Sequence, residues 1–433
     1  CVCVCVCGSA PQMANAILVG AGEYTTGFVH GAASASDKKI GVVGLVMFDL
    51  RRRGLVKRIA IVDVDGTRFP GVREHFAKNI AARYREMDTS FESFPDDSVQ
   101  HDAAAYLRAF QQFPAGAVVT IFVPDIFHFE IAKAAIIAGH HVLIAKPAVQ
   151  HLRDHMELTQ LAEQTKVLAA VEFHKRWDPC YADAIGRMRD LGSFSYFSAY
   201  MSQPKLQLHT FKAWAGRHSD ISFYLNSHHI DVHCCGVRHT MRPVGVHAAA
   251  SVGIANEVLG VSDVTIEDTI TLLTTWEERQ PAEGSACKLQ AHAVYTASWT
   301  TPKTDVHSQQ QFHYLASKGE IRIDQAHRGY VCASDSDGYA SINPLYMCYT
   351  PDRAGYFAGQ NGYGYKSIEA FVDAAMRVNA GKATPEECCD SLATLATTAE
   401  VTAILEAGRM SLDVRRPVRI VHAEDGRMTL QAQ

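Results

Sequence analysis

The chain has 433 residues, which is too long for one ordinary hydrophobic core and predicts two large domains. Its apolar fraction of 47%, charged fraction of 20% and formal net charge of −5 are those of an ordinary soluble protein, and they exclude the basic excess that attracts nucleic acid or an anionic membrane. We find no uninterrupted apolar run of roughly 18 residues, so no transmembrane helix is expected. Small polar or anionic metabolites stay open as substrates.

Four of the twelve cysteines lie in the opening sequence CVCVCVCG, at alternate positions. Alternate residues of a strand point the same way, so these thiols could converge on a soft metal, but structural zinc sites usually use pairs separated by two to four residues. We therefore expect residues 1–13 to be a disordered or artefactual tail, and we expect no metal site. The other cysteines fit neither a disulfide framework nor a CxxC motif, which favours a reducing, cytoplasmic location.

The segment after the tail predicts the start of a dinucleotide-binding domain. An apolar strand over residues 16–19 leads into the sequence GAG, the beginning of a glycine turn of the dinucleotide type. The third glycine is missing, and the next helix, within GVVGLVMFDLRRRG, is expected to start near residues 36–37 with Asp37 as its N-cap and to end at Gly54. Residues 23–36 therefore form an inserted loop. The residues expected to contact the cofactor here are Gly20, Gly22, Glu23 and Tyr24.

An acidic residue ends the second predicted strand, RIAIVDVD, which closes with Asp63 and Asp65. A carboxylate at this point accepts hydrogen bonds from the adenosine ribose and repels a 2′-phosphate, so Asp63 favours NAD over NADP. Arg68 lies only five residues after Asp63, and an arginine at this place can accommodate the 2′-phosphate, so NADP is the alternative cofactor.

The segment from Ala117 to Pro147 predicts a βαβ unit. In the run AVVTIFV the residues that would point to either face of a strand are mostly apolar, as in a strand buried on both faces of a parallel sheet. The run stops at a Pro-Asp pair, which cannot continue the hydrogen-bond ladder. A helix follows and ends at Gly139, and the next strand, HHVLIA, delivers Lys146 at its carboxyl end. Ligands of open α/β sheets bind at this edge, so we expect Lys146 to face the cofactor and the substrate.

This segment resembles the same part of the glucose-fructose oxidoreductase, inositol dehydrogenase and MocA (Gfo/Idh/MocA) family. In that family a strand ending in a Pro-containing turn and a His precedes a helix and an E-K-P motif, which here reads Ala145-Lys146-Pro147. The resemblance runs from about residue 14 to 412 and implies a Rossmann domain, a nicotinamide cofactor and a lysine that carries the chemistry. It places the cofactor against Val123, Pro124, His128, Lys146 and Pro147. His128 could instead cap the helix that follows.

Beyond Pro147 the order of elements is similar to the family's crossover into its second domain. A strand ends in the tripeptide KRW at residues 175–177, and a helix follows. Arg176 is open to two roles, a substrate contact or an inter-domain salt bridge.

Long alternating segments then predict a largely antiparallel sheet. They are FSYFSAYMS, VGVHAAASVGI, VTIEDTITLLTTW, LQAHAVYTASWT, QQFHYLASKGEIRID and GYVCAS. The open face of such a sheet favours a homodimer or a homotetramer. We therefore expect an α/β plus α+β chain, with a Rossmann domain over residues 14–150 and a substrate-binding and oligomerisation domain, built on a large, mainly antiparallel open sheet, over residues 151–433.

The resemblance also implies a catalytic histidine on the helix SDISFYLNSHHIDVHCCGV, which is similar to the family's D-x-x-x-H-x-x-D pattern. Aligning Asp231 with the final Asp of the pattern selects His228. The neighbouring His229 is the rival choice, because adjacent residues of a helix point about 100° apart and only one of them can face the cleft.

The upstream Asp of the pattern falls on Tyr224, so Asn226 or Asp220 would have to orient the imidazole. The histidines and the aspartate of this helix could also share a metal ion, but the family chemistry needs none.

These observations predict an NAD(P)-dependent oxidoreductase that transfers hydride between a nicotinamide and a sugar, polyol or sugar-derived acid. The residues expected to contact the substrate are Lys146, Arg176, Asn226 and His228. One alternative is a non-catalytic dinucleotide-binding sensor or partner subunit, which the missing third glycine, Ala145 and Tyr224 favour. The other is a redox-neutral, NAD-dependent glycosidase, although the GGH-type signature of that branch is not found here.

Overall fold

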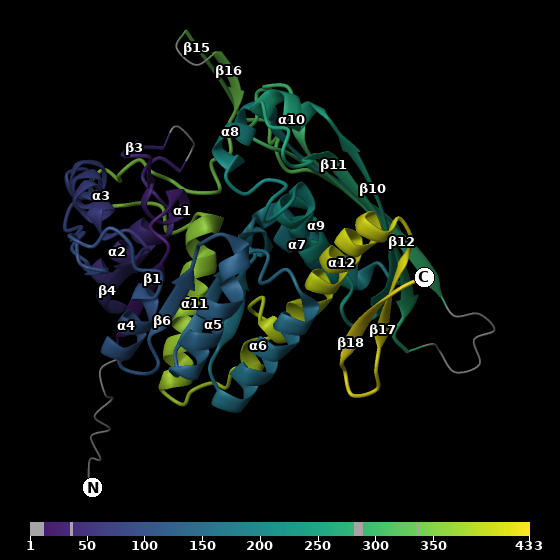
Figure 1. Ribbon diagram of the computed structural model, residues 1–433, viewed down its shortest axis with the longest axis horizontal. Helices are drawn as coiled ribbons and strands as arrows, with labels where there is room; N and C mark the ends of the chain where they lie inside the picture. Colours follow the sequence, from purple (N-terminus) through teal and green to yellow (C-terminus); the bar gives the residue numbers. More distant parts are fainter. Residues whose placement is uncertain (1–12, 35–37, 281–288, 336–337) are drawn as a thin grey trace, which may run out of the picture.

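The computed structural model describes residues 13–34, 38–280, 289–335 and 338–433. Figure 1 shows a lobe built mostly from the N-terminal part of the chain, in purple to blue, beside a lobe built on a large sheet from the later part. Residues 1–12 of the expected tail, and Asp37, lie outside the described residues. Within those ranges, no helix combines the length and the apolar character needed to cross a bilayer.

The first lobe contains a six-stranded sheet of order β5-β4-β1-β6-β7-β8, in which every neighbouring pair is parallel. The strands are β1 (Ala14–Val19), β4 (Val56–Val62), β5 (Glu92–Phe94), β6 (Val118–Ile121), β7 (His141–Ala145) and β8 (Ala169–Glu172). The inner strands are buried on both faces, as their apolar runs predict. Because β8 belongs to this sheet, the Rossmann unit extends past the boundary that we expected at residue 150.

Helices cover both faces of this sheet. One face packs against α2 (Val43–Arg52), α3 (Phe69–Phe76) and α11 (Tyr363–Asn379). The other face packs against α4 (Ala105–Gln112), α5 (His128–Ile137) and α6 (Leu152–Thr165). Helix α11, yellow-green in Figure 1, comes from the C-terminal part of the chain, so the first lobe is not built from one continuous segment.

The expected insertion between the first strand and the next long helix is present, but that helix begins later than predicted. The segment contains α1 (Glu23–Thr26), β2 (Phe28–Val29) and β3 (Ala32–Ala33). Helix α2 begins at Val43 because Gly41, at φ +77°, adopts a left-handed conformation that interrupts the run. At Gly20, where φ is +102°, a Cβ would lie 2.2 Å from the carbonyl oxygen of Phe122, so only glycine fits between the ends of β1 and β6.

The second lobe is built on an eight-stranded sheet of order β14-β13-β9-β12-β11-β10-β17-β18. The strands are β9 (Phe194–Pro204), β10 (Met241–Val252), β11 (Glu267–Glu278), β12 (Gln290–Thr301), β13 (Gln309–Ala316), β14 (Gly319–Asp324), β17 (Val418–His422) and β18 (Met428–Ala432). Every neighbouring pair is antiparallel except β9–β12. The predicted fold class is therefore confirmed.

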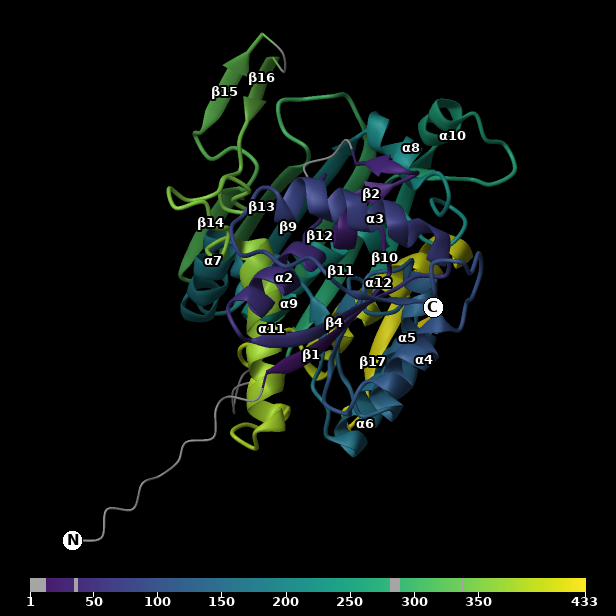
Figure 2. The same cartoon turned by 90° about the vertical axis from the view of Figure 1, so that its left-hand side faces the viewer.

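Helices α7 (Pro179–Asp190), α9 (Ser227–Val237) and α12 (Leu395–Val414) share a core with this sheet. Side chains along β11 alternate between buried and more accessible positions, and Leu273 on its outer face is 42% exposed. The short helices α8 (Leu208–Phe211) and α10 (Ile254–Leu259) lie near one end of the sheet, and β15 (Val331–Ser334) and β16 (Gly338–Ser341) form a separate hairpin that projects from the body in Figures 1 and 2.

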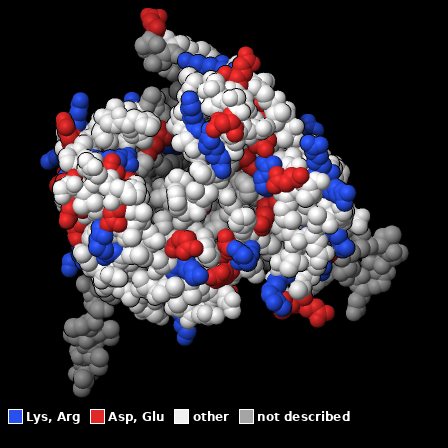
Figure 3. Space-filling view, viewed as in Figure 1, with Lys and Arg blue, Asp and Glu red and all other residues white. Residues whose placement is uncertain are grey.

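On the face shown in Figure 3, lysines and arginines are interspersed with aspartates and glutamates. Charges of both signs are therefore mixed over this view of the described residues, as the composition predicts.

Candidate active site

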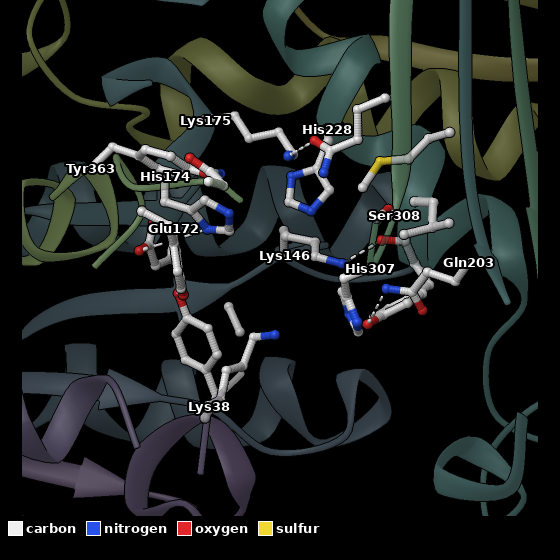
Figure 4. Close-up of a pocket in the computed structure, with 18 of the residues that line it drawn as sticks. Lys38, Lys146, Glu172, His174, Lys175, Gln203, His228, His307, Ser308 and Tyr363 are labelled. Atoms are coloured by element: carbon white, nitrogen blue, oxygen red, sulfur yellow. Dashed lines mark hydrogen bonds and ion pairs between the residues drawn. The ribbon is translucent and has the colours of Figure 1, made fainter. Parts of the chain in front are cut away.

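A cavity of about 840 Å³ lies at the carboxyl ends of the parallel strands and is lined by residues of both lobes. The Rossmann sheet contributes residues that follow β6, β7 and β8. The second lobe contributes residues of β9, of α9 and of the segment 306–310. Segment 341–349 and the first residue of α11 also line the cavity. Figure 4 shows labelled side chains from the ends of β7 and β8, from β9, from α9 and from segment 306–310 pointing into one space.

Lys146 follows β7 and reaches across the cavity to the second lobe. Its ammonium group donates a hydrogen bond to the carbonyl oxygen of Tyr224 and lies 4.0 Å from the centre of the Tyr224 ring. Desolvation and the nearby positive charge of Lys175 lower the pKa of Lys146 to about 7. Tyr224, which replaces an aspartate of the family pattern, therefore contacts the lysine with both its backbone and its ring.

The adjacent histidines of α9 have different surroundings. His228 lines the cavity, where its ring packs edge-on against His174 at a centroid distance of 5.3 Å. Its Nδ1 atom is buried and has no hydrogen-bond partner among the described residues. The Nε2 atom of His229 instead lies 2.9 Å from the hydroxyl oxygen of Tyr181, on the far side of the helix. Burial holds the pKa of His228 well below its ordinary value, so the imidazole is neutral.

The two residues expected to orient His228 have other partners. Asn226 donates to the hydroxyl of Ser222 at 3.0 Å and is not among the residues that line the cavity. Asp220 accepts hydrogen bonds from the backbone amides of Ser222 and Phe223, at 2.8 and 2.9 Å. Both side chains therefore form hydrogen bonds at the start of their own helical segment. The structure gives no support to the expected substrate contact by Asn226.

Arg176 takes the second of its two expected roles. Its Nε and Nη2 atoms donate to the two carboxylate oxygens of Asp231, at 2.8 and 2.6 Å. The side chains of Arg176 and Asp231 are only 10% and 1% exposed. This buried ion pair fixes α9 to the segment that follows β8, which leaves Arg176 outside the cavity lining and without support as a substrate contact.

The ends of β6 and β7 are tied together by His128. Its two ring nitrogens lie 2.9 Å from the carbonyl oxygen of Pro147 and 3.0 Å from that of Val123. His128 therefore holds two strand ends in place, and it lines the cavity together with Val123, Pro124 and Pro147.

The glycine turn and Asp63 form the adenosine side of the expected cofactor site. The carboxylate of Asp63 accepts a hydrogen bond from the backbone amide of Ala21 at 3.1 Å and forms a 2.7 Å ion pair with Arg68. A Cβ added to Gly22 would meet no atom within 4 Å, so the chain leaves open space beside the turn.

Tyr24 lines the cavity from the inserted loop, stacked on Phe122 at 5.1 Å, while Glu23 accepts a hydrogen bond from Ser34. Buried oxygens of Glu172 and Gln203 also face the cavity without partners among the described residues. The open glycine turn and the acidic β4 end fit a dinucleotide such as NAD.

Three cavity residues that we did not predict lie at the end of β8 or just after it, namely Glu172, His174 and Lys175. The same reasoning that selected Lys146 at the end of β7 would have found them, because ligands bind at carboxyl strand ends. Glu172 is paired in register with Ala145 on the neighbouring strand, so a carboxyl group lies beside the position where the family motif has its glutamate. Burial raises the pKa of Glu172 to about 8, and its Oε1 accepts a hydrogen bond from Ser367 at 2.7 Å.

Residues 15–173 match the family described as "Oxidoreductase family, NAD-binding Rossmann fold", GFO_IDH_MocA. An uncharacterised oxidoreductase from Synechocystis is 40% identical over 68 residues, which are 16% of this chain and 18% of that protein. The scyllo-inositol 2-dehydrogenase (NADP⁺) of Bacillus subtilis is 33% identical over 85 residues, which are 20% of this chain and 23% of that protein. The matched segments thus span well under two thirds of these curated relatives.

Among solved structures, the myo-inositol 2-dehydrogenase of Lactobacillus plantarum is similar with a TM-score of 0.62 at 16% identity, over 95% of this chain and 100% of that one. The scyllo-inositol dehydrogenase of Lactobacillus casei, solved with NAD(H) and scyllo-inositol, has a TM-score of 0.60 at 14% identity, over 94% and 99% of the two chains. These likenesses show a shared two-domain fold.

The structural role of Arg176 is tested by Asp231→Asn. Removing one charge of a buried pair leaves the other uncompensated, so we expect a loss of about 3–5 kcal/mol in the free energy of unfolding, measured by urea denaturation. The matched control is Arg187→Met, which breaks the exposed Arg187–Asp183 pair and should leave the free energy of unfolding almost unchanged. Unchanged stability in Asp231→Asn, with a raised KM for substrate, would instead assign Arg176 to substrate binding.

Proposed function

The chain belongs to the Gfo/Idh/MocA oxidoreductase family, whose Rossmann fold binds NAD, and from this premise we propose that it is a nicotinamide-dependent dehydrogenase. The proposed substrate is the CH–OH group of a sugar, a polyol or a sugar-derived acid. The inositol dehydrogenases of the same fold, one of them solved with NAD(H) and scyllo-inositol, support this class of substrate. NAD is the proposed cofactor, and NADP is possible because Arg68 is ion-paired with Asp63.

One observation carries the proposal. A single cavity brings together Lys146, from the end of a Rossmann strand, and His228, from a helix of the other lobe. Both side chains line this cavity, and Figure 4 shows them pointing into the same space.

The two side chains have complementary roles toward a substrate hydroxyl. A bound nicotinamide supplies the acceptor for hydride. Lys146, with a pKa lowered to about 7, is suited to take the hydroxyl proton near neutral pH. The neutral imidazole of His228 holds the same oxygen by a hydrogen bond without adding a competing positive charge. Tyr224 holds the lysine until the substrate displaces its carbonyl oxygen from the ammonium group.

Replacing Lys146 with Met should lower kcat by roughly 10²–10⁴-fold, because the acceptor of the hydroxyl proton is removed. The affinity for NAD, measured by calorimetry, should change little. The control is Lys133→Met, which removes an exposed lysine of α5 and should leave both quantities unchanged. Undiminished NADH formation by Lys146→Met would contradict the proposal. Product formed without any change in nicotinamide absorbance would indicate redox-neutral chemistry instead.

The pH dependence of oxidation follows from the same pKa. Below it Lys146 is protonated and cannot accept the hydroxyl proton, so kcat/KM should rise with pH and level off above about 7. Replacing His228 with Asn should lower the plateau while the inflection persists, because Lys146 produces it. A profile that stays flat through neutral pH in the wild-type protein, or an inflection that vanishes in His228→Asn, would contradict these roles.

We also propose that the open face of the eight-stranded sheet forms a homodimer or homotetramer interface. This is supported by apolar side chains on the outer face, Leu273 of β11 and Leu315 of β13, which are 42% and 40% exposed. A cytoplasmic location is proposed as well. It is supported by the described cysteines, all of which are free thiols.

The interface is tested by Leu273→Glu, because a buried unpaired carboxylate in each subunit would oppose association. Light scattering should show a smaller particle than the wild-type oligomer. The matched control is Leu107→Glu on α4, where the side chain is 40% exposed on the other lobe and the mass should not change. A monomeric wild-type protein, or an unchanged mass in Leu273→Glu, would rule out this interface.

A further inference from the structure

Two lysines of the cavity have only neutral hydrogen-bond acceptors. Lys146 donates to the backbone carbonyl of Tyr224, and Lys175 donates to the side-chain oxygen of Gln310. In the described part of the chain, neither lysine forms a salt bridge with a carboxylate. Lys175 is 3% exposed, although buried charges in proteins are normally paired with an opposite charge.

The carboxyl groups near the cavity do not supply the missing negative charge. Glu172 has a pKa raised to about 8 by burial, so it is largely protonated and neutral at pH 7. Burial lowers the pKa of Lys175 to about 7, and the charge of Asp178 only partly opposes this shift, because the Asp178 carboxylate is itself held in a buried ion pair with Arg328. The charge of Asp125 acts on Lys146 from nearby, but its carboxylate accepts hydrogen bonds from Ser219 and Gln150, at 2.7 and 3.1 Å. When the two lysines are protonated, the cavity therefore carries more positive than negative charge, and a bound anion would favour their protonated state.

The expected cofactor does not account for Lys175. A dinucleotide pyrophosphate lies at the glycine turn after β1, whereas Lys175 follows β8. The strand order places β8 three strands from β1, which corresponds to about 14 Å at roughly 4.8 Å per strand. Lys38, which precedes α2, is the cavity lysine that comes from the chain between β1 and β4.

Lys175 lies instead on the substrate side of the cavity. In Figure 4 it points into the same space as His228 and Lys146, the two groups assigned to the reacting hydroxyl. Neutral polar side chains suited to hydroxyl groups, among them Gln203 and Ser308, line the same space. Because Lys146 is assigned to the reacting oxygen, Lys175 is available to bind a different group of the substrate.

We propose that the cavity selects substrates that carry an anionic group, a carboxylate or a phosphate, and that Lys175 binds this group. The inference rests on the dehydrogenase function proposed above and narrows its substrate class. An ammonium group is a compact point charge that suits either anion, and the hydroxyl-bearing carbons of the same molecule then extend from Lys175 toward Lys146 and His228.

The test compares neutral and anionic members of matched sets. Several hexose epimers are assayed with NAD beside the uronate and the 6-phosphate of each. We expect kcat/KM to be higher for an anionic member by roughly ten- to a hundredfold, the worth of a hydrogen bond to a charged group. In Lys175→Met that preference should disappear through a raised KM for the anion, while values for neutral sugars stay within about twofold. Comparison of the uronates with the 6-phosphates then shows whether the site prefers a carboxylate or a phosphate.

Two further variants separate charge from folding. Lys175→Arg keeps the positive charge and should keep a preference for anions, and Gln310→Glu places a carboxylate against Lys175 and should abolish it. Lys318→Met, on the exposed turn between β13 and β14, is the matched control and should behave as wild type. Equal use of neutral and anionic sugars by the wild-type protein, or an equal loss for both in Lys175→Met, would overturn the proposal.

Binding measured without turnover distinguishes this proposal from the function on which it rests. Uronate or sugar phosphate is titrated by calorimetry into the NADH complex of the wild-type protein and of Lys175→Met. Lys175-dependent binding without any NAD reduction would support the anion site and overturn the dehydrogenase assignment. NAD reduction by neutral polyols, with no anion binding, would overturn the anion site and leave the dehydrogenase assignment standing.

Discussion

The contact between the ammonium group of Lys146 and the carbonyl oxygen of Tyr224 joins the two halves of the site. Lys146 is delivered by a buried strand of the parallel sheet, and Tyr224 belongs to the segment that leads into α9. His228 comes four residues after Tyr224, which places both on one side of a helical segment. The buried ion pair between Arg176 and Asp231 is a second link between the same two regions. Together these contacts fix the distance between the proposed base and the proposed imidazole.

Strand ends were the part of the site that the sequence predicted best, because apolar runs that stop at polar residues mark the ligand edge of a parallel sheet. That rule found Lys146, and applied to β8 it would have found Glu172 and Lys175. Helix geometry alone could not choose between His228 and His229, since their directions depend on how α9 packs on Tyr181. Gln203, Ser308 and the other lining residues of the second lobe could not be predicted, because tertiary packing alone brings their distant segments to the cavity.

The fold was predicted in outline, and its errors have local causes. The first lobe extends past the expected boundary because β8 pairs with β7, and α11 returns from the C-terminal part to cover the sheet. Strands β17 and β18, at one end of the sheet, have only five residues each, which is too short for a clear alternation in the sequence. The departures at Ala145 and Tyr224 leave the lysine supported, because Glu172 brings a carboxyl group beside Ala145 and the Tyr224 backbone holds the ammonium group.

The central claim is that Lys146 and His228 act on one substrate oxygen. A crystal structure of the protein with NADH and a bound substrate tests it most directly. The account predicts that the reacting hydroxyl lies within about 3.2 Å of both the Lys146 Nζ and a ring nitrogen of His228, with Lys146 moved off the Tyr224 carbonyl. A complex in which Lys146 stays on Tyr224 and the reacting hydroxyl contacts neither side chain would contradict the account.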